Sequence, residues 1–131
     1  MPSPVLTLTK EERICSKKLI EALFAGNGSR SMTSYPIRAV FLEQKSAEGE
    51  PPVQLLVSVP KRCFKRAVKR NRVKRQIREA FRRNKHVLAD AVTGSGRSVA
   101  VALIWMSADL SATHLVETKV KDLLVRIKER L

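Results

Sequence analysis

The stretch KRCFKRAVKRNRVKRQIREAFRRNK, residues Lys61 to Lys85, carries most of the net charge of the chain, and the other elements can be placed around it. It holds thirteen Lys or Arg residues and a single acid, Glu79, which gives it +12 of the formal +14 of all 131 residues. The rest of the chain has 13 basic and 11 acidic residues and is close to balance. A charge density this high repels itself unless water or a polyanion surrounds it, so nucleic acid is the expected partner.

The same stretch has the hydrophobic period of a helix. From Val73 onward, apolar residues plotted at 100° per residue fall within about a third of the circle, the width of a stripe that packs on a core. These residues are Val73, Ile77, Ala80, Phe81, Val87, Leu88 and Ala91. The opposite side carries Lys74, Arg75, Arg78, Arg82 and Lys85. The pattern predicts an amphipathic helix with an exposed cationic face, and the lack of interleaved acids removes the usual i,i+4 partners of those cations.

Two motifs in this region resemble the signature of the bacterial ribonuclease P protein subunit. SVPKR (Ser58 to Arg62) matches a strand that ends in Ser-Val-x-Lys-Lys or similar, and RNRVKRQIREAFR (Arg70 to Arg82) matches the family's Arg-Asn-Arg helix. Cations and apolar positions stay in register over these thirteen residues of the helix. The resemblance implies that the chain assists a catalytic RNA, which uses bound Mg²⁺, in removing the 5′ leader of precursor tRNA.

The resemblance also implies two groups of site residues. Cations of the basic stretch would bind phosphates of the catalytic RNA, and Asn71 would either hydrogen-bond to RNA or cap the helix. This RNA-binding group is Lys61, Arg62, Lys65, Arg66, Lys69, Arg70, Asn71, Arg72, Lys74, Arg75 and Arg78. The candidates for a cleft that takes the single-stranded leader are Ile20, Phe24, Arg38 and Ser58. Phe24 has an alternative as an ordinary core residue, and Arg38 has one as half of a salt bridge.

The remaining elements complete an α+β fold with a small mixed β-sheet, in the order α-β-β-β-α-β-α. A helix begins at a capping box at Thr9, or at Ser16, and runs to Ala25. Strands are expected at 29–33, Tyr35–Leu42, Val53–Val59 and Ser98–Met106, and a last helix, capped near Ser111, at Ala112–Leu131. We expect one domain, residues 1–131, with its helices on one side of the sheet. The general rule favours a right-handed strand–basic helix–strand connection, whereas the resemblance implies a left-handed βαβ crossover.

Charge and shape are present in the sequence, but a reacting group is not. A protein nuclease needs an acid–base pair or a carboxylate cluster for metals, whereas His86 and His114 stand apart without partners and the acids are scattered. We therefore expect no catalytic residue and no dedicated metal site, with Mg²⁺ used by the RNA subunit. The isolated Cys15 and Cys63, and the absence of a signal or membrane segment, predict a cytoplasmic protein with reduced thiols and without an implied protein partner.

Three other interpretations stay open. A general RNA-binding protein of ribosomal type would share the charge but would need no leader cleft. A basic-helix DNA binder would need a dimer seam or a recognition helix, and the basic helix is not followed by heptads. A nuclease acting on its own would cleave without any RNA subunit.

Overall fold

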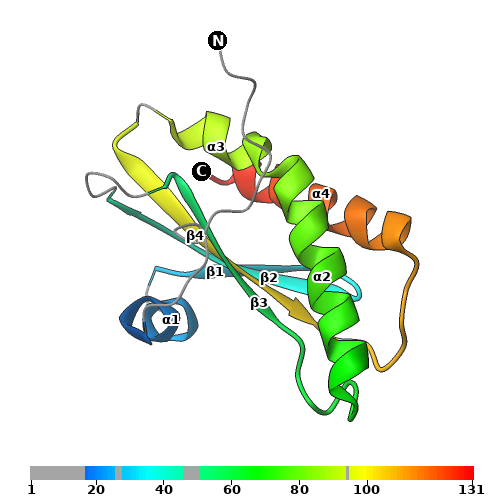
Figure 1. Cartoon of the computed structure of the whole chain (residues 1–131). Helices are drawn as coiled ribbons and strands as arrows, with labels where there is room; N and C mark the ends of the chain where they lie inside the picture. Colours follow the sequence, from blue (N-terminus) through cyan, green and yellow to red (C-terminus); the bar gives the residue numbers. More distant parts are fainter. Residues whose placement is uncertain (1–16, 26–27, 46–50, 94) are drawn as a thin grey trace.

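The computed structural model describes residues 17–25, 28–45, 51–93 and 95–131, so the helix start expected at Thr9 or Ser16 lies outside the described residues. Its elements follow the expected order, except that the basic helix is divided in two (Figure 1). They are α1 Lys17–Phe24, β1 Arg30–Ser34, β2 Ile37–Lys45, β3 Val53–Ser58, α2 Ala67–Asn84, α3 His86–Val92, β4 Arg97–Trp105 and α4 Thr113–Glu129.

The described strands form a mixed sheet in the order β1-β2-β4-β3. β4 pairs antiparallel with β2 on one side and parallel with β3 on the other, which confirms the small mixed sheet. Its residues Val99 to Leu103 are fully buried, because strands flank it on both edges and side chains cover both of its faces. A nearly continuous apolar run is what such a strand requires.

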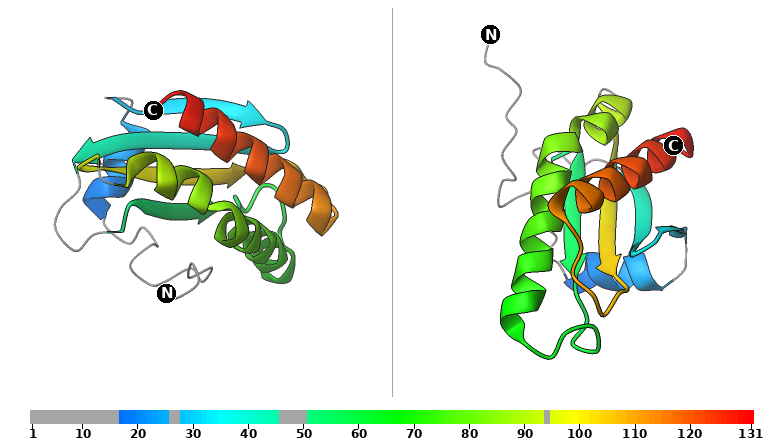
Figure 2. Two further views of the ribbon diagram at one scale, coloured as in Figure 1. Left: turned by 90° about the horizontal axis from the view of Figure 1, so that it is seen from above. Right: turned by 90° about the vertical axis from the view of Figure 1, so that its right-hand side faces the viewer.

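Helices α2, α3 and α4 cover one face of the sheet, and α1 lies against the other (Figures 1 and 2). The expectation that the helices share one side is therefore wrong for α1. Leu23 of α1 packs with Val40, Ala100 and Ala102, and the two alanines leave space for a helix to approach the middle of the sheet. We call this surface the α1 face and the opposite one the helical face.

Strand alternation divides the apolar residues between the two faces. Ile37, Ala39 and Phe41 join the large core on the helical face, whereas Val40 belongs to the small cluster on the α1 face. In β3, Val53 and Leu55 are buried in the large core and Leu56 packs on the α1 face. Successive residues of β2 and β3 therefore face opposite sides of the sheet, as the period of two in a strand requires.

Helix α2 docks through the stripe that the sequence predicts, with Val73, Ile77 and Phe81 fully buried. The single helix expected to continue to Ala91 is instead interrupted at Lys85, and Ala91 is exposed. The break allows Leu88, which is completely buried, to turn back onto the core.

The connection from β3 through α2 and α3 to β4 joins two parallel neighbours (Figure 2, left). Viewed with α2 and α3 in front and both strands pointing upward, β4 lies to the left of β3. The crossover is therefore left-handed, as the family resemblance implied and contrary to the general rule for parallel strands.

Helix α4 packs across the helical face through buried apolar residues, among them Val116 and Leu123. Its N-cap is Ala112, without a side-chain cap, so the cap expected near Ser111 is wrong. Gln76 of α2 ties the start of α4 in place, since its Nε2 donates to the Ser111 carbonyl at 3.1 Å and to Thr113 Oγ1 at 3.1 Å.

Replacing Val73 with alanine should lower the free energy of unfolding by about 2–3 kcal/mol, because the change removes two buried methyl groups and leaves a cavity. The matched control is Val68→Ala on the same helix, since Val68 is 78% exposed and Val73 is fully buried. We expect V68A to change stability by less than about 0.5 kcal/mol. Urea titrations followed by circular dichroism measure both variants, and equal losses would contradict docking through this stripe.

Candidate nucleic-acid interface

The segment Lys61–Arg66, which we call the basic turn, joins β3 to α2 and alternates between buried and exposed side chains. Cys63 and Phe64 are 9% and 5% exposed and face the core, where Cys63 Sγ approaches the Trp105 carbonyl oxygen at 3.7 Å. The Cys63 amide donates to the Pro60 carbonyl at 3.0 Å and closes the turn. The four cations are all exposed: Lys61, Arg62, Lys65 and Arg66. The buried pair thus holds a turn whose charges all face water.

The amino-terminal end of α2 strengthens the positive potential of this turn. Arg66 is the N-cap residue and forms no side-chain cap, and the first turn of the helix contains no acid. The partial positive charge of the helix amino terminus therefore adds to that of the nearby cations, because no acid in the first turn neutralises it. Arg70, one turn into the helix, donates from Nη1 to the carbonyl oxygens of Phe64 at 2.8 Å and Lys65 at 2.9 Å.

Along α2 the other predicted RNA-binding residues differ in exposure. Lys69, Asn71, Arg72 and Arg75 are exposed, whereas Lys74 and Arg78 are half-buried. Asn71 stands within α2 and not at its start, so the alternative in which it caps the helix is wrong. Within the described part of the chain, no ion pair involves Lys61, Arg62, Lys65, Arg66, Lys69, Arg72, Lys74 or Arg75. These eight charges are available to an external anion.

Glu79, the acid of the basic stretch, compensates two arginines near the other end of α2. Arg82 donates from Nε to Glu79 Oε2 at 2.9 Å and also pairs through Nη2 with Oε1, and Arg83 approaches Oε1 at 3.3 Å. Arg83 lies 3.7 Å from Glu117 of α4 as well. The hydrogen bond from Arg82, together with the charges of both arginines, lowers the pKa of Glu79 to about 2. Among the described residues, the cations that lack carboxylate partners are therefore concentrated toward the basic turn.

The leader-cleft candidates lie on the α1 face, where they are only partly brought together. Phe24 and Arg38 line one hollow of about 190 Å³ between α1 and the edge of the sheet. The lining is Leu23, Phe24, Ser29, Arg30, Ser31, Arg38 and Val40, and we call this hollow the cleft. Ile20 instead packs, half-buried, in the apolar cluster under α1. Ser58 does not line the cleft.

The two open alternatives for these residues are resolved by exposure. Phe24 is 51% exposed, so its interpretation as an ordinary core residue is wrong. Arg38 is exposed and has no salt-bridge partner among the described residues. Sequence reasoning missed Arg30, which lines the cleft and donates from Nη1 to the Arg130 carbonyl at 3.0 Å. Arg30 stands at the first position of a short polar strand and offers no periodic signal there.

Strand register relates the cleft to the basic turn. Thr33 pairs with Arg38, Arg38 with Ile104, and Ile104 with Ser58, so these residues form one row across all four strands. Arg38 and Ser58 are two strands apart, which corresponds to roughly 10 Å at ordinary strand spacing. Pro60 and the basic turn follow Ser58 directly. The row thus runs from the cleft side of the sheet to the start of the cationic turn.

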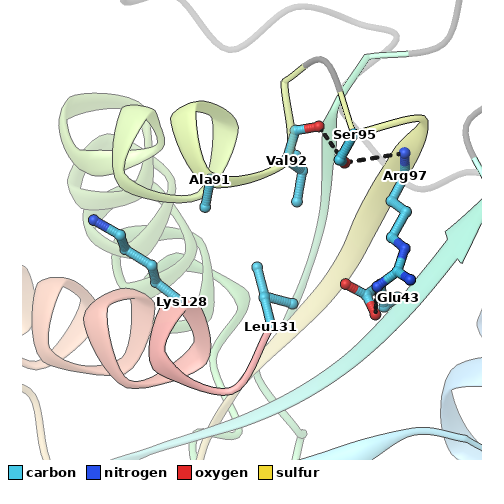
Figure 3. A pocket seen from close by; sticks show the side chains of 7 residues that line it. All are labelled: Glu43, Ala91, Val92, Ser95, Arg97, Lys128 and Leu131. Carbon is cyan, nitrogen blue, oxygen red and sulfur yellow. Dashed lines mark hydrogen bonds and ion pairs between the residues drawn. The ribbon is translucent and has the colours of Figure 1, made fainter.

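A larger hollow, of about 530 Å³, lies at the opposite end of β4, by its first residue, Arg97 (Figure 3). It is lined by Glu43, Ala91, Val92, Ser95, Arg97, Lys128 and Leu131. Figure 3 shows Arg97 reaching back to Glu43, and the two groups form an ion pair at 3.1 Å. None of the predicted site residues lies here.

Groups able to carry out chemistry are sparse in the described part of the chain. Among the residues that the structure describes, no group of three or more His, Cys, Asp or Glu side chains could hold a metal ion. His86 and His114 are exposed on α3 and α4, which confirms them as surface residues. Cys63 is a buried free thiol, whereas Cys15 lies outside the described residues. None of the described helices is long and apolar enough to cross a membrane.

This fold and surface define a small α+β protein that presents a cationic turn and helix at one end of a mixed sheet. The ribonuclease P family model matches residues 8–128. The chain is 38% identical over 124 residues to the ribonuclease P protein component of Porphyromonas gingivalis W83, which covers 95% of this chain and 88% of the relative. A Chlorobaculum tepidum protein of the same name is 33% identical over 87 residues, which cover 65% of this chain and 55% of that relative. The chain therefore belongs to the ribonuclease P protein family.

Solved structures agree with the fold. A Staphylococcus aureus ribonuclease P protein mutant superposes with a TM-score of 0.68 at 19% identity, covering 92% of this chain and 90% of that chain. The ribonuclease P protein of Thermotoga maritima gives a TM-score of 0.66 at 23% identity, with coverage of 88% and 96%. At these identities the likeness concerns the fold alone.

The Glu79 ion pair should make stability depend on acidity. Because the pKa of Glu79 is lowered from 4.5 to about 2, its contribution is present above pH 4.5 and is lost as the pH falls from about 4.5 toward 2. The carboxylate is 41% exposed, so we expect Glu79→Gln to cost only about 0.5–1 kcal/mol at pH 7.

Urea unfolding of E79Q and the wild type at pH 7, 4 and 3 tests this prediction. The difference between their free energies of unfolding should become smaller below pH 4.5. Glu129→Gln controls for the loss of one negative charge, since Glu129 is exposed and has no ion pair among the described residues. A gap that widens on acidification would contradict the assignment.

Proposed function

We propose that this protein is the protein subunit of ribonuclease P. It binds the catalytic RNA and the 5′ leader of precursor tRNA, and it assists the endonucleolytic cut that gives the mature 5′ end. Membership of the family supports the subunit role. The observation that carries the proposal is the position of the cationic turn, which follows directly from the end of the strand row that contains Arg38.

The cations of the basic turn and α2 neutralise phosphates of the folded RNA. Exposed cations without carboxylate partners, such as Arg62, Arg66 and Arg72, exchange water and counterions for phosphate oxygens at little internal cost. Guanidinium groups suit this role because their paired N–H donors match two phosphate oxygens at once. Affinity should fall steeply with salt. In a plot of log binding constant against log salt concentration, each neutralised phosphate should add about −0.7 to −0.9 to the slope.

The α1 face holds the leader. Phe24 offers an exposed ring on which an unpaired base can stack, a contact worth about 1–3 kcal/mol per base in other single-strand binders. Arg38 and Arg30 supply guanidinium groups to the same hollow. Holding the leader favours the precursor over mature tRNA, because the mature form has no strand to place there.

The cutting itself belongs to the RNA subunit and its Mg²⁺. The described residues that line the cleft include no carboxylate and no histidine, so they supply no acid–base pair there. The chain contributes positive charge, which lowers the concentration of Mg²⁺ needed to fold the RNA and to bring precursor tRNA to it. The proposed partners are thus ribonuclease P RNA and precursor tRNA, in the cytoplasm.

Reconstitution tests the subunit role. Purified protein, ribonuclease P RNA and precursor tRNA are combined at low Mg²⁺, with each component omitted in turn. We expect 5′ processing with protein and RNA together, none with protein alone, and a higher Mg²⁺ requirement with RNA alone. Cleavage by the protein alone would support an independent nuclease. Binding of ribosomal RNA at least as tight as that of ribonuclease P RNA would favour a general RNA-binding protein of ribosomal type.

Arg38→Ala should weaken binding of precursor tRNA by the holoenzyme about fivefold to tenfold, since it removes one charge-assisted contact to the leader. Binding of mature tRNA should not change. Arg97→Ala removes the same charge at the far end of the sheet, where Arg97 pairs with Glu43, and serves as the matched control. Competition binding with precursor and mature tRNA measures the difference, and an equal loss for both ligands would remove Arg38 from the leader site.

A further inference from the structure

Arg70 and Arg72, the two arginines of the Arg-Asn-Arg motif, have different surroundings in the structure. Arg70 is half-buried and donates from one nitrogen to the carbonyl oxygens of Phe64 and Lys65, at 2.8 and 2.9 Å. Arg72 is exposed and makes no hydrogen bond or ion pair within the part of the chain that the structure describes. Two residues that look equivalent in the sequence are therefore placed for different tasks.

The basic turn needs an attachment of the kind that Arg70 provides. Four of the six residues of the turn are exposed cations and none is an acid, so these side chains repel one another. Cys63 and Phe64 attach the turn to the core from the sheet side, through apolar contacts and through the Cys63 thiol, which approaches the Trp105 carbonyl oxygen. Arg66 provides no cap for the start of α2. Besides the backbone bond from the Arg70 amide to the Arg66 carbonyl at 3.3 Å, the polar connection between the turn and the helix comes from the guanidinium of Arg70.

Lysine cannot reproduce this connection. Arg70 reaches back to two successive carbonyl oxygens, and charge-assisted hydrogen bonds of this type are about twice as strong as neutral ones. Both bonds come from Nη1, and the lysine side chain is shorter and its ammonium group more strongly hydrated, so lysine keeps the charge but does not place a donor where Nη1 lies. Arg70→Lys therefore separates the positioning of the turn from simple charge.

We propose that Arg70 is a positioning residue, which holds the basic turn against α2 so that Lys61, Arg62, Lys65 and Arg66 meet RNA as one preformed set. Arg72 contacts phosphate directly. The part of this inference that concerns RNA rests on the proposed function. The part that concerns the turn is a property of the protein alone and is tested without RNA.

The first experiment measures how readily the turn opens in the free, full-length protein. Cys63 is buried at the centre of the turn, so its alkylation by iodoacetamide, quantified on the Cys63 peptide by mass spectrometry, reports opening. We expect alkylation to be about tenfold faster in R70K than in the wild type, and unchanged in R72K, the matched control.

Peptide-resolved amide exchange separates local from global opening in the same samples. Exchange should rise in residues 61–67 of R70K while α4 keeps its protection. An unchanged Cys63 rate in R70K, or a rise that extends equally to α4, would overturn the proposal.

The second experiment is a double-mutant cycle on binding of ribonuclease P RNA. R70K and R72K are each combined with the turn variant K61A/R62A/K65A/R66A. We expect R70K to weaken binding about tenfold in the wild-type background but less than about twofold when the turn cations are absent. R72K should cost the same factor in both backgrounds.

An R70K effect of equal size in both backgrounds would make Arg70 an ordinary phosphate contact and overturn its positioning role. If the wild type itself fails to bind this RNA in preference to other RNAs, the proposed function fails, while the alkylation result still decides the role of Arg70 in the turn.

Discussion

Burial of the α2 stripe is the interaction on which the rest of the structure depends. Val73, Ile77 and Phe81 are fully buried against the sheet, and their burial contributes roughly 5–9 kcal/mol in total. That contribution has to exceed the mutual repulsion of the cations on the same helix. Gln76 adds a polar connection to the start of α4. A strongly charged helix thus keeps one fixed orientation before any RNA is bound.

The sheet then decides where the charge is presented. β3 and β4 run in parallel, so both end at the same edge, where Ser58 leads into the basic turn and Trp105 accepts a contact from Cys63. The β1–β2 turn lies at this end too, because Ile37 pairs with Trp105. The topology therefore places Arg38 of the cleft and the cationic turn at the same end of the strands, although they are far apart in the sequence. The opposite end of the sheet carries a compensated pair, Arg97 and Glu43.

Hydrophobic periodicity in the sequence is enough to predict an element and its buried side where one face of that element packs on the core. The alternation around β3 and the stripe of α2 were predictable because burial imposes a period on the sequence. What the sequence could not show were relations between segments. The placement of α1 depends on Ala100 and Ala102 lying under it, and the interruption at Lys85 accompanies the burial of Leu88 in the core. The partners of Arg70 are backbone carbonyls, which leave no trace in residue identity.

The late position of β4 in the chain has a consequence for biosynthesis. β4 is the strand that joins β2 to β3, yet it spans Arg97–Trp105, so a ribosome must synthesise about four-fifths of the protein before the sheet can close. α2 leaves the exit tunnel before β4 does. During that interval its apolar stripe is uncovered and its cations are close to ribosomal RNA. Nascent chains of this protein should therefore depend on chaperones, or on the RNA nearby, until Trp105 has emerged.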